Sequence, residues 1–323
     1  MNTASSDHQQ TGGTLPPSPR PAPLLGYLFA ATGAVLFSSK AVVIKLAYAP
    51  PHRVNAETLL VLRMGLALPI YLAIGLADLR RRVKGRLPIP GGRLVLRAAG
   101  VGIVGYWVAS YADFLGLRFI SAHFERLILF TYPGFVVLLG AAFFGQRVRA
   151  VTLAALGVSY AGLALIFAAG HNPEPARDTA IGAGLVLIAS IAFASYQLIA
   201  KPAIQSMGSR LFTCVAMTGA TVPALAQFAL ARPPGDLAVS PVVLGYGLLL
   251  AIGATVLPSF FLNAALHRIS AQANGVIGTL SPVATILLAV LILGERLTAA
   301  DVTGAALVLA GVGWFTFADR KTP

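Results

Sequence analysis

The sequence predicts an all-α membrane protein with ten transmembrane helices, arranged as two inverted five-helix repeats. Composition is the first reason: 57% of the 323 residues are hydrophobic and 11% are charged, whereas a soluble domain carries about 25% charged residues. The second reason is that apolar stretches of about 20 residues, each enough to cross a bilayer, follow one another along the chain. The third reason is that motifs of the first half return in the second half.

The expected spans are helices rather than strands of a membrane barrel. Barrel strands alternate polar and apolar residues over about ten positions, whereas these runs are longer and uniformly apolar. Short connections that contain proline or glycine separate the spans. In chain order, we expect the spans at residues 24–46, 57–77, 95–116, 121–144, 150–169, 181–201, 210–231, 242–265, 271–293 and 299–318.

Residues 1–23 are polar and rich in proline and contain no apolar stretch. They predict a disordered cytoplasmic tail rather than a cleaved signal peptide. With the N-terminus in the cytoplasm, 15 of the 24 Lys and Arg residues fall on the inner side and 5 on the outer side, as the positive-inside rule requires. We therefore expect a protein of the bacterial inner membrane with both termini in the cytoplasm. The densest basic cluster, from Arg80 to Arg97, is then a cytoplasmic loop, and no nucleic-acid partner is expected.

Two constant offsets relate the halves of the chain. At an offset of 149 residues, Pro133 matches Pro282, and segments 120–122, 145–147 and 161–162 match 269–271, 294–296 and 310–311. At an offset of 156 residues, Phe37, Ser39 and Lys45 match Phe193, Ser195 and Lys201. The two repeats are expected at 24–169 and 181–318. Because each holds an odd number of helices, the second enters the membrane upside down, which is the architecture of alternating access.

One motif of the second repeat carries a family resemblance. It consists of Leu280-Ser281-Pro282-Val283, then Gly294-Glu295-Arg296-Leu297, then Gly304-Ala305-Ala306-Leu307. The first repeat has a variant, Tyr132-Pro133 followed by Gly145-Gln146-Arg147, with Gln146 where the pattern usually has Glu. This pattern resembles the EamA family of the drug/metabolite transporter superfamily. The resemblance implies a ten-helix, exporter-like fold with a central cavity, which moves amino acids, metabolites or drugs.

Ionisable side chains inside the expected spans are the first candidates for solute binding, because each costs about 2.5–3.5 kcal/mol to insert. All fall in the first repeat: Lys40, Lys45, Arg63, Asp113, Glu125 and Arg126. Lys40 lies deepest, whereas Lys45 can extend its ammonium group to the interface. Arg63 has a structural alternative, an ion pair with Glu57 or Asp113. The excess of positive charge favours a solute with a carboxylate or phosphate group, and Glu125 or Asp113 is expected to exchange a coupling proton.

The second repeat offers neutral polar candidates instead, namely Tyr196, Asn263 and Asn274. Trp107, Tyr111 and Tyr196 could stack on a solute ring, although aromatic residues also pack between helices or lie at the interface. Pro133 and Pro282 are expected inside their helices as kinks and as hinges near the binding region.

These features favour a secondary transporter that exports small polar metabolites, such as amino acids or other carboxylate-bearing solutes. The alternatives are an importer or antiporter of anionic or phosphorylated metabolites, and a non-transporting membrane scaffold. The five histidines are scattered and no Gly-rich phosphate loop follows a strand, so we expect no enzyme activity, no metal and no cofactor. The expected partners are a small-molecule substrate and the lipid bilayer, and the oligomeric state stays open.

Overall fold

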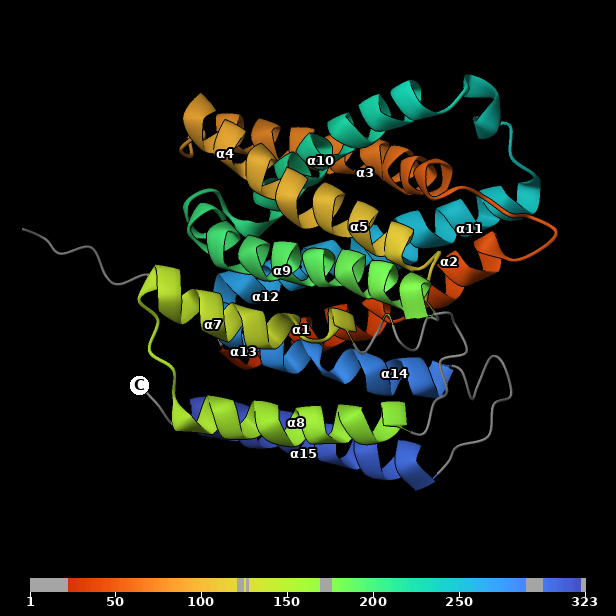
Figure 1. Cartoon of the computed structure of the whole chain (residues 1–323). Coiled ribbons are helices and arrows are strands. Elements are labelled where there is room, and N and C mark those ends of the chain that lie inside the picture. Colours follow the sequence, from red (N-terminus) through yellow and green to blue (C-terminus); the bar gives the residue numbers. More distant parts are fainter. Residues whose placement is uncertain (1–22, 121–124, 126–127, 169–175, 289–298, 321–323) are drawn as a thin grey trace, which may run out of the picture.

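A computed structural model describes residues 23–120, 125, 128–168, 176–288 and 299–320, and within these ranges the chain forms helices and no strands (Figure 1). The first half contains α1 (Pro23–Phe37), α2 (Lys40–Tyr48), α3 (Ala56–Lys84), α4 (Gly92–Gly102), η1 (Ile103–Val108), α5 (Ala109–Gly116), α7 (Tyr132–Phe144) and α8 (Ala150–Ala168). The second half contains α9 (Ala176–Met207), α10 (Ser209–Ala231), η2 (Pro234–Leu237), α11 (Pro241–Ala251), η3 (Ile252–Val256), α12 (Leu257–Arg268), α13 (Ala271–Gly278), α14 (Leu280–Leu288) and α15 (Ala299–Arg320).

Six helical stretches in the described part of the chain are long and apolar enough to cross a membrane. They are Pro23–Tyr48, Ala56–Lys84, Gly92–Gly116, Arg177–Met207, Ser209–Ala231 and Pro241–Arg268. Shorter apolar helices cover Tyr132–Phe144, Ala150–Gly162 and Val302–Phe315. The all-helical membrane class is therefore confirmed, whereas the count of ten spans and the inverted repeats stay predictions.

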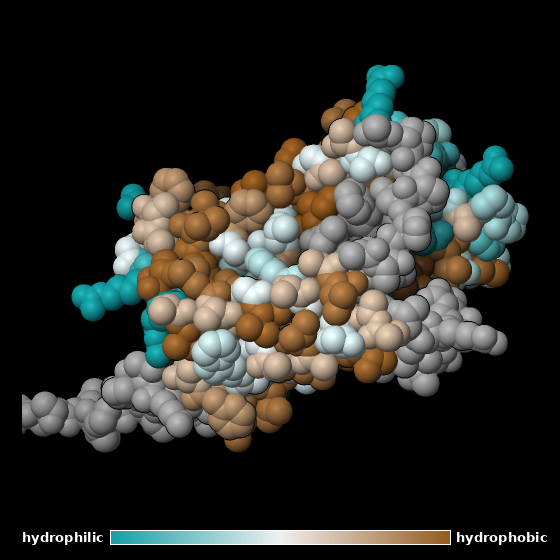
Figure 2. Space-filling model, turned by 60° about the horizontal axis from the view of Figure 1, so that its bottom comes forward, coloured by the Kyte–Doolittle hydropathy of each residue, from teal (hydrophilic) through white to brown (hydrophobic). Residues whose placement is uncertain are grey.

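The outer surface is apolar, as lipid contact requires. Leu96, Phe143 and Leu230 are 75%, 76% and 90% exposed. Figure 2 shows one face of the molecule, on which hydrophobic side chains spread between hydrophilic side chains at the two ends. Bilayer lipid, rather than a protein core, would cover these side chains.

Two long spans contain a π-helical segment at corresponding positions. η1 separates α4 from α5, and η3 separates α11 from α12. The two segments begin at Ile103 and Ile252, which are related by the offset of 149 found in the sequence. A π segment inserts an extra residue into the helical turn and locally re-aims the side chains around it.

The two matched prolines lie at helix starts rather than inside helices. Pro133 is the second residue of α7, after a turn at Phe130 and Thr131, and Pro282 is the third residue of α14, after a break at Thr279. The expected mid-helix position is therefore wrong, whereas the expected interruption occurs in both halves. Proline suits the first turn of a helix because the backbone N–H that it lacks has no helical acceptor there. The hinge role of both prolines stays a prediction.

The helix packing pairs elements of one half with elements of the other. α1 packs against α12, α9 packs against α5, and α3 packs against α10. α8 and α15 lie side by side at one edge of the molecule, and α15 ends beside the start of α8, so the two helices run in opposite directions (Figure 1). Their contact depends on small residues: a Cβ atom at Gly162 would lie 2.5 Å from the Gly304 carbonyl oxygen, and one at Gly311 would lie 2.3 Å from Ser159 Oγ.

Candidate functional site

A cavity lies at the centre of the molecule, between the two halves of the chain. Side chains of α1, α2, α3, η1, α5, α9, η3 and α12 line it, together with the starts of α7 and α14. The cavity offers about 60 Å³ to the centres of water molecules, which is room for a few waters. A metabolite therefore fits only if the surrounding helices move apart.

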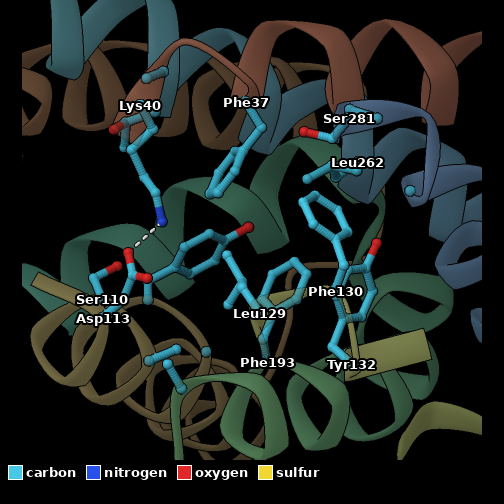
Figure 3. A pocket seen from close by; sticks show the side chains of 18 of the residues that line it. Phe37, Lys40, Ser110, Asp113, Leu129, Phe130, Tyr132, Phe193, Leu262 and Ser281 are labelled. Atoms are coloured by element: carbon cyan, nitrogen blue, oxygen red, sulfur yellow. Dashed lines mark hydrogen bonds and ion pairs between the residues drawn. The ribbon is translucent and has the colours of Figure 1, made fainter. Parts of the chain in front are cut away.

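The polar end of the cavity contains a buried ion pair. Lys40 is the first residue of α2, just after the break between α1 and α2, and its Nζ lies 2.5 Å from Asp113 Oδ2 on α5 (Figure 3). Both side chains are buried, and the Lys40 ammonium also lies 5.0 Å from the centre of the Phe37 ring. A charge-assisted hydrogen bond of this length neutralises both groups. The structure thus brings together two of the predicted site residues.

Arg63 lines the same end of the cavity, and it is 1% exposed. Its Nη2 donates to Ser110 Oγ at 2.7 Å, and its guanidinium carbon lies 5.2 Å from the centre of the Phe114 ring. Among the described residues, no carboxylate lies within 4.0 Å of the guanidinium nitrogens. The structural alternative for Arg63, an ion pair with Glu57 or Asp113, is therefore not formed, because Asp113 is bound by Lys40 and Glu57 by Arg232.

The other end of the cavity is aromatic, and its residues were not predicted from the sequence as site residues. The rings of Phe37 and Phe193 stack with centres 6.4 Å apart and an interplanar angle of 24°, and Tyr132 meets Phe193 edge-on at 5.1 Å. Figure 3 shows Phe130, Phe193 and Tyr132 on the side away from Ser110 and Asp113, whereas the Phe37 ring lies beside Lys40. Phe37 and Phe193 are the pair matched at an offset of 156 residues, so the repeat contained a signal for them.

A second feature missed from the sequence is the contact between Ser38 and Ser281. The Ser38 Oγ lies 2.7 Å from Ser281 Oγ, and its single O–H has two carbonyl acceptors within hydrogen-bond distance, Ser281 at 2.9 Å and Ala34 at 2.8 Å. Both serines are buried. They connect the break in the first span to the start of α14, where two interrupted helices meet at the cavity.

The neutral candidates of the second half form a hydrogen-bonded network beside the cavity rather than in its wall. Tyr196 donates to Asn263 Oδ1 at 2.5 Å, and its hydroxyl lies 2.9 Å from the hydroxyl of Tyr106, which does line the cavity. Asn263 Nδ2 donates to the Tyr106 hydroxyl at 3.1 Å and to Thr213 Oγ1 at 3.0 Å. Asn274 lies apart from this network and donates to Gln197 Oε1 at 2.7 Å.

Two aromatic candidates lie outside the cavity. Trp107 Nε1 donates to Gln227 Oε1 at 2.9 Å, and the Tyr111 hydroxyl donates to Glu57 Oε1 at 3.5 Å. Glu57 Oε2 also accepts a hydrogen bond from Arg232 Nη2 at 3.1 Å. These contacts connect η1 and α5 to α3 and to the end of α10.

The last two charged candidates are Glu125 and Arg126. Glu125 is fully buried, but it is not among the residues that line the cavity. Arg126 lies outside the described residues. Within the described ranges, Asp and Glu do not gather with His or Cys into any group of three or more that could hold a metal ion.

Two lysines make corresponding contacts in the two halves. Lys45 Nζ donates to the Ile120 carbonyl at 2.8 Å, and Lys201 Nζ donates to the carbonyls of Ile269 and Leu266. The lysines are matched at an offset of 156 residues, and Ile120 and Ile269 at an offset of 149. Each ammonium group satisfies carbonyls that the end of a helix leaves without a partner.

Comparison with known proteins gives one family. The model of the EamA-like transporter family matches twice, at residues 24–168 and 180–317. An uncharacterized transporter of Bacillus subtilis (strain 168), YcbK, is 28% identical over 310 residues, which cover 92% of this chain and 94% of that protein. An uncharacterized transporter of Synechocystis sp., sll1319, is 23% identical over 320 residues, covering 93% and 95%. One solved crystal structure matches with a TM-score of 0.73 at 18% identity, over 92% of this chain and 98% of that one, which shows the fold alone.

Proposed function

We infer that this chain, which belongs to the EamA-like transporter family, is a secondary transporter that exports small polar metabolites, such as amino acids or other carboxylate-bearing solutes, by alternating access. It is a multi-pass membrane protein, and we place it in the bacterial inner membrane with both termini in the cytoplasm. The observation that carries the proposal is the central cavity with Lys40, Arg63 and Asp113 in its wall. Buried ionisable groups in a membrane domain mark solute pathways.

Alternating access is supported by features that recur at a constant offset. The π segments η1 and η3, the helix breaks before Pro133 and Pro282, and the close-packed Gly162 and Gly311 all correspond at about 149 residues. Such correspondence is expected if ten helices form two inverted repeats that rock against each other around a fixed site. The stacked pair Phe37 and Phe193 then lies where the two repeats meet.

In this mechanism the two interrupted spans act as the moving parts. α7 and α14 begin at the cavity, where Tyr132 and Ser281 line its wall. A break leaves each following helix free to tilt without breaking regular backbone hydrogen bonds, because those bonds already end there. Pro133 and Pro282 keep the starts of these helices rigid, so that bending is confined to the preceding turn.

A buried acid in the first half is the proposed site of proton coupling. Asp113 is in the cavity wall and Glu125 is buried near the start of the fourth span. If either acid exchanges the coupling proton, flux through the double variant Asp113→Asn with Glu125→Gln no longer follows an imposed pH gradient. Unchanged pH dependence of flux in this double variant would exclude both acids from the role.

Proteoliposome transport tests the proposed function. Purified protein would be reconstituted with ¹⁴C-labelled amino acids and monocarboxylates inside, and the release of each solute measured with and without a pH gradient. We expect saturable release of at least one carboxylate-bearing solute, and the variant Arg147→Gln, which changes an exposed residue outside the cavity wall, should release it like wild type. Release that requires solute on the opposite side would indicate an antiporter, and the absence of saturable flux for every solute would contradict transport.

A further inference from the structure

The hydrogen-bonding capacity of Arg63 is largely unused. A guanidinium group carries five N–H donors, and the described contacts of Arg63 comprise one hydrogen bond, to Ser110. Its Nε is buried and finds no acceptor among the described residues. A buried charge without a partner is unfavourable unless a ligand supplies one. The cavity wall therefore contains a positively charged, planar guanidinium group with unused N–H donors, which is complementary to a carboxylate.

The neighbouring charges cannot supply this partner. Asp113 is one helical turn beyond Ser110 on α5, but its carboxylate is bound by Lys40 at 2.5 Å. Lys40 and Asp113 neutralise each other, which leaves the single positive charge of Arg63 at this end of the cavity. A solute with one negative charge balances that charge, whereas a dianion leaves an excess and an organic cation is repelled.

The remaining wall selects for an apolar body. Phe37, Phe130 and Phe193 line the cavity together with Leu129 and Leu262 (Figure 3). The Phe130 and Phe193 rings lie on the side away from Ser110, which binds Arg63, and the Phe37 ring lies beside Lys40 and stacks on Phe193. A solute that reaches from Arg63 across the cavity therefore places its far end against hydrocarbon, where burial of apolar surface favours binding.

We propose that Arg63 binds the carboxylate of the transported solute, and that the preferred solute is an amphipathic monocarboxylate whose apolar body packs among Phe37, Phe130 and Phe193. This inference rests on the proposed function only in treating the central cavity as the solute site. It narrows the expected substrates from small polar metabolites in general to organic monoanions with one apolar end. A zwitterionic amino acid would also need a partner for its ammonium group, and the only carboxylate in the described cavity wall is bound by Lys40.

Ligand binding to the full-length protein in lipid nanodiscs tests the proposal. The probes are 3-phenylpropanoate, the neutral 3-phenylpropan-1-ol, the cationic 3-phenylpropylamine, phenylalanine and inorganic phosphate, with Kd measured by titration calorimetry. We expect 3-phenylpropanoate to bind most tightly. Arg63→Gln should weaken its binding by about tenfold to a hundredfold, as the loss of a hydrogen bond to a charged group does. Arg118→Gln, which removes an exposed charge at the end of α5, should leave Kd unchanged.

Three results would overturn the proposal: tighter binding of the amine, phenylalanine or phosphate than of 3-phenylpropanoate, equal affinity for the alcohol, or an Arg63→Gln variant that binds like wild type. If 3-phenylpropanoate binds as expected but no solute crosses proteoliposomes, the proposed transport fails while the carboxylate site stands. If transport occurs for solutes that do not compete with 3-phenylpropanoate, the transport function stands and the carboxylate site fails.

The stability of Arg63 variants separates a binding role from a structural one. The desolvation cost of the buried charge offsets much of what the hydrogen bond to Ser110 contributes to stability. Without ligand, Arg63→Met should therefore unfold at about the same temperature as wild type or higher, and it should lose the thermal shift that 3-phenylpropanoate induces. Arg63→Lys keeps the positive charge but not the planar guanidinium group, and should retain part of that thermal shift. A lower Tm for Arg63→Met, combined with a normal ligand-induced shift, would identify Arg63 as structural and overturn the proposal.

Discussion

The two halves of the molecule share their backbone features and differ in the chemistry that they present to the cavity. Both have a π segment in a long span, a broken span that restarts near a proline, and a lysine that binds helix-end carbonyls. Yet Lys40 and Asp113 of the first half correspond, at offsets of 156 and 149, to Tyr196 and Leu262 of the second. These backbone features thus recur in both halves, whereas the charged residues of the described cavity wall, Lys40, Arg63 and Asp113, all belong to the first half.

This difference distinguishes the residues that stabilise the fold from the residues that we propose to bind the solute. In the second half the polar groups of Tyr196 and Asn263 are satisfied by their neighbours, and a fully satisfied buried network rigidifies a core. In the first half, on our proposal, the carboxylate of a ligand balances the charge of Arg63. Scaffold variants at matched positions should therefore have equal effects in the two halves, and cavity variants should have unequal effects.

The largest effect is expected from Asp113→Asn, because it leaves Lys40 buried without a counterion. Breaking a buried ion pair from one side destabilises by about 3–5 kcal/mol. Thermal unfolding in detergent micelles measures this loss. The double variant Lys40→Met with Asp113→Leu removes both charges and should recover most of the stability. A loss in the single variant that the double variant does not reverse would contradict the account of the pair.

A smaller and symmetric effect is expected at the contact between α8 and α15. Valine at Gly162 or at Gly311 would force its Cβ onto atoms of the facing helix, and overpacking of this kind costs about 1–3 kcal/mol. Gly157→Val is the matched control on α8, because nothing lies within 4 Å of a Cβ there. Unfolding temperatures of the three variants should show equal losses for the first two and little change for the third. A large loss at only one of the two matched positions would contradict the expected equivalence of the two halves.

The neutral network should matter for stability but little for the solute. Asn263→Leu removes hydrogen bonds to Tyr106, Tyr196 and Thr213, which predicts a loss of about 1–2 kcal/mol. Because Asn263 does not line the cavity, the Kd for 3-phenylpropanoate should stay within about threefold of wild type, a change of under 1 kcal/mol. Calorimetry on this variant beside Arg63→Gln makes the comparison direct. Equal loss of affinity in both variants would place solute recognition in both halves.

The smallest effects are expected from the lysines at the helix ends. Lys45→Met and Lys201→Met each remove hydrogen bonds to backbone carbonyls, worth about 0.5–1.5 kcal/mol. Because both lysines serve the scaffold, their losses should be similar, and thermal unfolding of the two single variants checks this. A strong effect of Lys45→Met on affinity for 3-phenylpropanoate would instead make Lys45 part of the solute site.

The sequence predicted the charged part of the site better than its geometry. Lys40, Arg63 and Asp113 stood out because a charge inside an apolar span is unfavourable without a function. Which acid pairs with which base depends on how separate helices pack, so the sequence did not decide whether Arg63 forms an ion pair. Trp107 in η1 and Tyr111 in α5 belong to the same long span as Asp113, but their hydrogen bonds go to Gln227 and Glu57 outside the cavity.

Other residues of the site are of types that are common in membrane spans, so their identity alone did not indicate a role in the site. Phe37 and Phe193 are common residues in a membrane span, and only their matched positions connect them. The contact between Ser38 and Ser281 joins residues 243 positions apart, which no local pattern reports. The two prolines did indicate interrupted helices, but they did not show at which residue the next helix begins.

Cysteine labelling of matched positions tests most directly whether the two halves cross the membrane in opposite directions. Ala150 and Ala299 are exposed, begin α8 and α15, and are related by the offset of 149. Single cysteines would be placed at each in a Cys214→Ala background, since Cys214 is the one native cysteine, and labelled in intact cells with a membrane-impermeant maleimide. We predict that the cysteine at 299 is labelled from outside and the cysteine at 150 only after permeabilisation. Labelling of both from the same side would contradict the inverted arrangement and the alternating access that depends on it.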